Sequence, residues 1–268
     1  MTILDRFYRS DIINLIPRYF QRKLKKKFNY YFVEIEVLNL PTNNHPGKIN
    51  FEEQKKMVED FIHKNYIPWT TSPYLVQLLK LIFIDQSREY NFLDFGGFNI
   101  DHYLYLKKNF ENIKYFYFDK KENNEVISKI KEEFLLKDIT VLNNLDEIKK
   151  KNYNFINFGS SIQYVDDYKF ILNNLLETNP EYIFFSAQTF YYKKINKVEK
   201  ITVKQVNILP QINYCYFFEY ERFLNIFKLK KFELVFKVLN FTDKVNYDNF
   251  NKEYGKIEYC DLLIKKTN

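Results

Sequence analysis

An acid and two adjacent glycines follow an apolar run in residues 91–97. Glycine is scarce in this chain of 268 residues, which holds only five. Two glycines side by side after a strand-like run predict a tight backbone turn or a close approach to another molecule. The pattern therefore predicts a strand that ends at a bound ligand, with Asp94, Gly96 and Gly97 at its tip.

A second apolar run, residues 155–158, leads into Gly159, Ser160 and Ser161. In an open α/β sheet, the loops at the carboxyl ends of strands form the ligand crevice. One of the three histidines, His102, lies beside a predicted ligand loop. Because imidazole titrates near neutral pH, His102 is a candidate general base. A helical first-turn residue bonded to a carbonyl oxygen explains it equally well.

Strands and helices alternate around these loops. The predicted strands end at polar residues and cover 114–118, 139–142, 153–158 and 182–186. The predicted helices cover 102–110, begun by Asp101 as a cap, 123–134 and 168–177. This alternation predicts a mostly parallel sheet with helices on its faces.

The two ends of the chain complete this pattern. Helices are predicted at 51–64 and 74–83, before the first strand, and at 219–227. Two extended segments, 232–241 and 259–265, are expected to form a C-terminal antiparallel pair. The fold class is therefore α/β and Rossmann-like, with seven strands. Residues 201–216 are expected to cover the crevice as a lid.

Turn-forming residues at 41–47 mark the best domain boundary. They divide a basic N-terminal extension, residues 1–50, from one large domain, residues 51–268. In the extension, apolar residues precede the basic run 22–27, which suits an anionic membrane surface. A solvated helix packed on the main domain explains the same pattern. No apolar run approaches the roughly 20 residues that span a bilayer, and we expect a cytoplasmic protein.

The net charge of +7 comes from lysines scattered over most polar stretches. Nucleic-acid binding would predict a clustered basic stripe with aromatic residues for stacking, so no nucleic acid is expected as a partner. The two cysteines, Cys215 and Cys260, lie in apolar surroundings with no CxxC pair. They are expected to be reduced core residues, and no metal site is expected.

Three motifs together resemble class I S-adenosylmethionine (SAM)-dependent methyltransferases. The resemblance is greatest to a bacterial branch whose members often lie in surface-polysaccharide gene clusters. It covers roughly residues 91–186. The motifs are the acid and glycines followed by His102-Tyr103, the acid Asp119 that ends the next strand 25 positions after Asp94, and the Ser-Ser-x-Gln-Tyr segment at 160–164.

The resemblance implies SAM as the methyl donor and S-adenosylhomocysteine (SAH) as the product. An acid at the tip of the second strand, here Asp119, can accept both ribose hydroxyls, although a turn aspartate is the alternative. Asp94 would hold the loop or meet the ammonium group through water. The expected cofactor site comprises Asp94, Gly96, Gly97, Asp119, Asn143, Asn144, Gly159, Ser160 and Ser161, of which the two asparagines are equally explained as loop residues.

Methyl transfer requires chiefly that an acceptor atom be held against the methyl group. His102 and Tyr164 are the candidate catalytic residues, and Tyr164 is alternatively a core aromatic. Gln163, Gln188 and Thr189 are candidate substrate contacts. The resemblance implies O-methylation of a small saccharide or precursor of capsular polysaccharide or lipopolysaccharide, and the basic charge would attract a phosphorylated one.

The sequence departs from the family at Phe98 and Ile100, where further glycines are usual. Bulky residues there would narrow the pocket floor, so a catalytically silent methyltransferase-like subunit that binds a partner protein is the alternative function. A dinucleotide cofactor is disfavoured because the GxGxxG pattern is absent.

Overall fold

The structure is a computed structural model. It describes residues 30–34, 40, 48–64, 73–85, 87–193, 198–208, 211–240, 245–246, 250 and 252–267. The basic run at 22–27, for which we predicted a membrane contact, lies outside these residues. Among the described helices, none has both the length and the apolar composition needed to span a bilayer.

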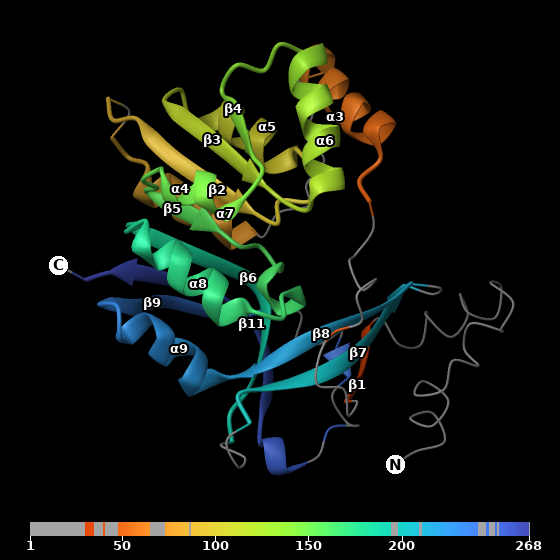
Figure 1. The fold of residues 1–268 in the computed structure, drawn as a ribbon, viewed down its shortest axis with the longest axis vertical. Coiled ribbons are helices and arrows are strands. Elements are labelled where there is room, and N and C mark those ends of the chain that lie inside the picture. Colours follow the sequence, from red (N-terminus) through yellow and green to blue (C-terminus); the bar gives the residue numbers. More distant parts are fainter. Residues whose placement is uncertain are drawn as a thin grey trace, which may run out of the picture.

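Five parallel strands position the loops singled out above (Figure 1). They are β2 (Tyr90–Phe95), β3 (Ile113–Phe118), β4 (Ile139–Leu142), β5 (Phe155–Asn157) and β6 (Tyr182–Tyr191). Their spatial order is β4-β3-β2-β5-β6. The chain thus runs outward from β2 to β4 and then returns to β5 on the other side of β2. The carboxyl ends of β2 and β5 form the topological switch point, where open α/β sheets bind ligands.

Helices cover both faces of this sheet. One face carries α3 (Phe51–Lys64), α4 (Pro73–Ile82), α5 (Asp101–Asn109) and α6 (Lys121–Glu133), whose apolar side chains share one core. The other face carries α7 (Leu145–Lys149), α8 (Tyr168–Glu177) and α9 (Tyr220–Lys228) around a second core. Side chains alternate between the two faces of a strand, so Phe92 packs in the first core and Leu93 and Phe95 in the second.

The C-terminal pair is antiparallel, as predicted. Strand β11 (Ile257–Lys266) lies between β6 and β9 (Phe232–Leu239) and is antiparallel to both. With the five parallel strands, this pair accounts for the seven strands predicted from the sequence.

The described sheet nevertheless has eleven strands, because four more extend it beyond β6. They are β1 (Tyr30–Glu34), β7 (Lys200–Ile208), β8 (Gln211–Glu219) and the short β10 (Val245–Asn246). The expected lid, 201–216, forms most of the antiparallel β7–β8 hairpin. One side of this hairpin is buried against Tyr191, and this burial stabilises both strands. The side chains that alternate onto this side are Ile201, Val203, Cys215 and Phe217. Strand β1, from the predicted extension, pairs with β7 in the same sheet.

Strand β6 links the two parts of the sheet. It continues past its predicted end at Ser186 and pairs with β8 through only Phe190 and Tyr191. A bulge at Ala187, with φ +54°, redirects it, and the buried Asp261 on β11 accepts a 2.7 Å hydrogen bond from the Ala187 N–H. A bulge increases local twist and bends a strand. Within the sheet, the added strands are therefore paired to β6 through two residues only.

Candidate active site

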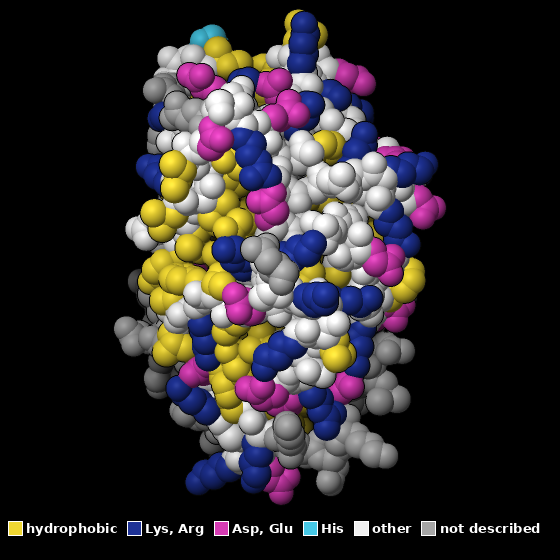
Figure 2. All heavy atoms as spheres, turned by 90° about the vertical axis from the view of Figure 1, so that its left-hand side faces the viewer, with side chains coloured by type: hydrophobic (Ala, Val, Ile, Leu, Met, Phe, Trp, Pro, Cys, Tyr) yellow, Lys and Arg dark blue, Asp and Glu magenta, His cyan; other side chains and the backbone are white. Residues whose placement is uncertain are grey.

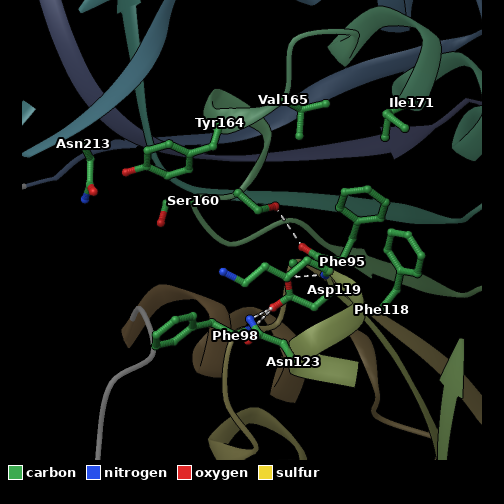
Figure 3. Close-up of a pocket in the computed structure, with 13 residues that line it drawn as sticks. Phe95, Phe98, Phe118, Asp119, Asn123, Ser160, Tyr164, Val165, Ile171 and Asn213 are labelled. Carbon is green, nitrogen blue, oxygen red and sulfur yellow. Dashed lines mark hydrogen bonds between the residues drawn. The ribbon is translucent and has the colours of Figure 1, made fainter. Parts of the chain in front are cut away.

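A pocket of about 540 Å³ lies at the carboxyl ends of β2, β3 and β5 (Figure 3). This volume is within the roughly 300–1,000 Å³ of small-molecule sites. Residues from five separate segments line it: Phe95, Gly96, Phe98, Phe118, Asp119, Lys120, Asn123, Ser160, Ser161, Tyr164, Val165, Ile171 and Asn213. The loops after β2 and β5 thus meet here, as the sequence predicted.

The turn at Gly96 brings these two loops into contact. Its φ of +70° is a conformation that favours glycine, and a Cβ atom there would lie 2.4 Å from Ser161 Cβ. The Ser161 hydroxyl lies 2.9 Å from the Phe95 carbonyl oxygen and 2.6 Å from that of Phe158. Gly97 does not line the pocket, and its Cβ would lie 2.8 Å from Asp94 Oδ2. Both glycines are therefore required by close packing.

Asp119 directly follows β3 and lines the pocket. Protein donors use only some of the hydrogen-bond acceptor positions of its carboxylate. Its Oδ2 atom accepts hydrogen bonds of 3.0 Å from the Phe98 N–H and from Asn123 Nδ2, and lies 3.3 Å from the Tyr117 hydroxyl. Its Oδ1 atom accepts one, from the Lys120 N–H at 2.6 Å. A carboxylate offers about four acceptor positions. The remaining capacity of Asp119 therefore lies on Oδ1.

The pocket has an apolar end and a polar end. Phe95, Phe118, Val165 and Ile171 gather at one end, and Ser160, Tyr164 and Asn213 at the other (Figure 3). The short 3-10 helix η2 (Ile162–Tyr164) places Tyr164, and β8 contributes Asn213 from the added strands. Such a cavity suits a ligand with a flat apolar part and a hydrogen-bonding part.

Phe98 lines the pocket, whereas Ile100 does not. Phe98 has φ +54°, and its side chain is 42% exposed. Ile100 is buried in the core beside α3, where its N–H donates to Gln54 Oε1 at 3.0 Å. Of the two departures from the family pattern, only Phe98 affects the pocket.

Asp94 and His102 lie on the opposite face of the sheet from the apolar end of the pocket. Asp94 is buried next to Phe95 in sequence, so its side chain points to the α5 face, where Tyr115 and Tyr117 also pack. Its Oδ1 accepts from Asn157 Nδ2 at 2.8 Å, and its Oδ2 from the Tyr115 hydroxyl and from His102 Nδ1 at 2.7 Å. Asp94 therefore ties β3, β5 and α5 together behind the glycine turn.

The charge on His102 follows from this environment. Burial opposes a charge on the imidazole, but the carboxylates of Asp94 and Asp101 outweigh it and raise the pKa of His102 to about 9. The ring is then protonated at neutral pH and donates to Asp94. Asp101 is not the predicted cap of α5: Ile100 holds the cap position, and Asp101 Oδ1 accepts from the His102 N–H at 2.9 Å. Burial raises the pKa of Asp101.

Asn143, Asn144 and Gly159 lie outside the pocket lining. Asn144 caps α7 by accepting from the Glu147 N–H at 2.9 Å, and the Asn143 N–H donates to Glu147 Oε2 at 2.9 Å. Gly159 has φ +51° with open space around its Cβ position. The two asparagines therefore shape the loop after β4.

The three predicted substrate contacts, Gln163, Gln188 and Thr189, are buried and lie outside the pocket lining. Gln163 Oε1 accepts a long 3.4 Å hydrogen bond from Gln188 Nε2. Gln188 Oε1 and Thr189 Oγ1 are buried without a hydrogen-bond partner in the described structure. The structure brings Gln163 and Gln188 together, and places Ser160, Ser161 and Tyr164 on the pocket surface.

Several lining residues were not identified from the sequence. Three of them, Phe118, Lys120 and Asn123, lie close to Asp119 at the end of β3 and the start of α6. Their closeness to Asp119 in the sequence is the feature that could have identified them as pocket residues. Asn213 lies in the segment expected to cover the crevice. Val165 and Ile171, near the start of α8, gave no signal distinct from core packing.

Comparison with solved structures identifies the fold. The N-terminal domain of EvdMO1, crystallised with SAH bound, aligns with a TM-score of 0.51 over 82% of this chain and 98% of that chain, at 8% identity. The chain shares the fold of this SAH-bound domain, and SAM-dependent methyltransferases are among its other structural neighbours. This shared fold confirms the predicted mixed α/β sheet with its antiparallel C-terminal pair, although the described strand count differs.

Two further solved structures also align with most of this chain. The same EvdMO1 domain in the presence of SAH and D-fucose gives a TM-score of 0.51 with the same coverage and identity. A SAM-dependent methyltransferase from Clostridium acetobutylicum aligns with a TM-score of 0.48 over 82% of this chain and all of that one, at 11% identity. No family model matches the sequence, and no curated protein matches it.

Proposed function

We propose that this protein is a SAM-dependent methyltransferase that binds SAM in the 540 Å³ pocket. The observation that carries the proposal is Asp119, which presents acceptor capacity on Oδ1 inside a pocket at the switch point of the sheet. An acid at the end of the second strand is suited to a ribose hydroxyl. The EvdMO1 domain that shares this fold was crystallised with SAH.

The residues present fit the parts of the cofactor. Asp119 Oδ1 would accept one ribose hydroxyl, because Oδ2 is already occupied by its protein donors. The apolar end would hold the adenine, and the Gly96 turn with Ser160 and Ser161 would hold the methionyl part. When bound, SAM supplies a methyl group on a sulfonium centre.

We further propose that the acceptor is a hydroxyl oxygen of a small saccharide or a precursor of a surface polysaccharide. The polar end offers the hydroxyls of Ser160 and Tyr164 and the amide of Asn213, groups suited to a ligand rich in hydroxyls. Lys120, which also lines the pocket, would favour a phosphorylated acceptor. The EvdMO1 domain was also crystallised in the presence of D-fucose.

The geometry changes the role proposed for His102. The ring does not line the pocket and is held as a cation by Asp94. We therefore propose that His102 positions the loop through Asp94 and that Tyr164, at the polar end, contacts the acceptor. Positioning would supply a large part of the rate of such a transfer, and the proton of the acceptor hydroxyl would pass to solvent water.

Calorimetric titration with SAH tests the cofactor, with NAD as the negative comparison. We expect micromolar binding of SAH, about −8 kcal/mol, and none of NAD. Labelled methyl transfer from SAM to a panel of sugar nucleotides and free sugars then tests the reaction. A folded protein that binds no SAH would contradict the proposal and favour the silent subunit, for which the bulk of Phe98 is the structural argument.

A further inference from the structure

Phe98 combines three unusual properties. It is a bulky residue in the left-handed region of φ, its side chain is 42% exposed, and it lines the pocket. Large side chains enter this region rarely, because Cβ crowds the following carbonyl oxygen. Such outliers persist when the surrounding structure determines them, and they cluster at ligand sites.

The neighbouring backbone fixes Phe98 in this conformation. The Asn99 N–H donates to the Gly97 carbonyl oxygen at 2.5 Å, and the Ile100 N–H to Gln54 Oε1 at 3.0 Å. The Phe98 N–H itself donates to Asp119 Oδ2 at 3.0 Å. The left-handed turn thus aims one backbone donor at the proposed ribose-binding carboxylate. It also fixes the start of the Phe98 side chain beside that carboxylate.

The ring of Phe98 is not used for core packing. No aromatic ring among the described residues stacks on it, although the neighbouring Phe95 packs on both Phe118 and Phe158. Figure 3 shows Phe98 across the pocket from Tyr164 and Val165. An exposed aromatic face at the edge of a pocket that has an apolar end is available to a flat ligand.

We propose that Phe98 is a cofactor-contacting residue whose ring packs on the ribose side of the adenosyl group of SAM, in place of the glycine usual at this position. This inference rests on the proposed function. Phe98 then has two linked effects: its N–H holds Asp119 Oδ2, which leaves Oδ1 for the ribose, and its ring covers the ribose side of the adenosyl group. The opposite expectation, that its bulk narrows the site, predicts the reverse effect of removing the ring.

Three variants test the proposal by calorimetry with SAH and with adenosine. Phe98→Gly removes the ring and keeps the left-handed backbone, and Phe98→Tyr keeps a ring. Leu135→Gly is the matched control, because Leu135 also has positive φ, at +52°, but is exposed and outside the pocket lining. Loss of the apolar contact made by a phenyl ring that the ligand buries predicts that Phe98→Gly weakens both ligands about 10-fold or more. Phe98→Tyr should stay within about 3-fold of wild type, and Leu135→Gly should bind as wild type.

Thermal unfolding without ligand separates binding from folding. Both glycine variants relieve the strain of a side chain on a backbone in the left-handed region of φ. Neither variant should therefore lower the melting temperature by more than about 2 °C. Equal or tighter SAH binding by Phe98→Gly overturns the proposal and shows that the ring only narrows the site. If neither wild type nor Phe98→Gly binds SAH, the proposed function itself fails.

Discussion

At the scale of single residues, the carboxylate of Asp119 links the protein framework to the proposed cofactor. Asp119→Ala removes the acceptor at Oδ1, so we expect SAH binding to weaken by about 10- to 100-fold, the range for hydrogen bonds to charged groups. Calorimetry measures the effect. Asn143→Ala is the control, because Asn143 is exposed and outside the pocket lining. Equal losses in the two variants would remove Asp119 from the ribose site.

The glycines of the two pocket loops differ in what surrounds them. Gly96→Ala would place Cβ 2.4 Å from Ser161 Cβ at φ +70°, and we expect a loss of about 2–4 kcal/mol in the free energy of unfolding. Gly159→Ala has φ +51° but open space, so only the left-handed strain of about 1 kcal/mol applies. Urea denaturation of both variants compares these costs. Similar losses would mean that contact with Ser161 is not what excludes a side chain at Gly96.

The ion pair between His102 and Asp94 predicts a dependence of stability on pH. The pKa of His102 is raised from 6.5 to about 9, so the folded state binds its proton more tightly than the unfolded chain. The stabilisation is therefore full below about pH 6.5 and is lost as the pH rises through about 9. It amounts to about 3 kcal/mol. Urea denaturation at pH 6 and 9.5 should show this loss in wild type.

His102→Gln is the comparison for that experiment. It cannot be charged, so the part of the pH dependence that comes from this ion pair should disappear, while titration of other groups remains. A variant that loses stability between pH 6 and 9.5 as steeply as wild type would show that His102 is not charged in the folded protein.

At the scale of elements, Asp166 connects the η2 loop to the added strands. Its Oδ1 accepts from the Leu40 N–H at 3.1 Å and from the Tyr216 hydroxyl on β8. Its carbonyl oxygen accepts from Lys200 Nζ at 2.9 Å, and that ammonium lies 3.6 Å from the centre of the Tyr216 ring. These contacts hold β7 and β8 beside the segment that carries Tyr164.

Asp166→Ala should loosen that connection. Losing two hydrogen bonds predicts faster amide exchange in β7 and β8, by about 10-fold, while β2, β3 and β5 stay protected. Hydrogen exchange with mass spectrometry resolves these strands. A uniform increase across the whole sheet would instead show that Asp166 supports global stability.

The elements show where sequence patterns are sufficient. The strands and helices from β2 to α8, except the short helix α7, are predicted because apolar runs ending at Asp94, Asp119 and Gly159 are short and bounded by polar residues. The added strands are not, because β7 and β8 obtain their stability from one another and from the distant β1. His102 lies on the α5 side of the sheet, where it contacts the buried Asp94. This placement depends on tertiary contacts that a short loop motif does not encode.

At the scale of the whole molecule, charge is dispersed over the face shown in Figure 2. Figure 2 shows Lys and Arg side chains spread over one face with acidic side chains between them. The net charge of +7 attracts anionic ligands without directing them to one place. This attraction is screened at physiological salt, where the Debye length is about 8 Å. Specificity for a phosphorylated acceptor would then depend on individual groups such as Lys120.

Ligand binding should be visible in the stability of the entire chain. A ligand at 100 times its dissociation constant stabilises a protein by about 2.7 kcal/mol, or about 5–10 °C for a domain of this size. We expect SAH at that concentration to raise the melting temperature by this amount and NAD to leave it unchanged. An equal shift with NAD would indicate a site that recognises adenosine without the methionyl part.

The limited pairing of the added strands with β6 has a consequence for substitutions in the β7–β8 hairpin. Strands β7 and β8 join the parallel sheet through two residues of β6, beyond the bulge at Ala187. Substitutions in the hairpin that spare its core residues Tyr216 and Phe218 can therefore leave the pairing of β2 with β3 unchanged. Asn213 lies on that hairpin and reaches the pocket. Under the proposed function, a substitution at Asn213 would change the contact with the acceptor while leaving the proposed methyl-donor site intact.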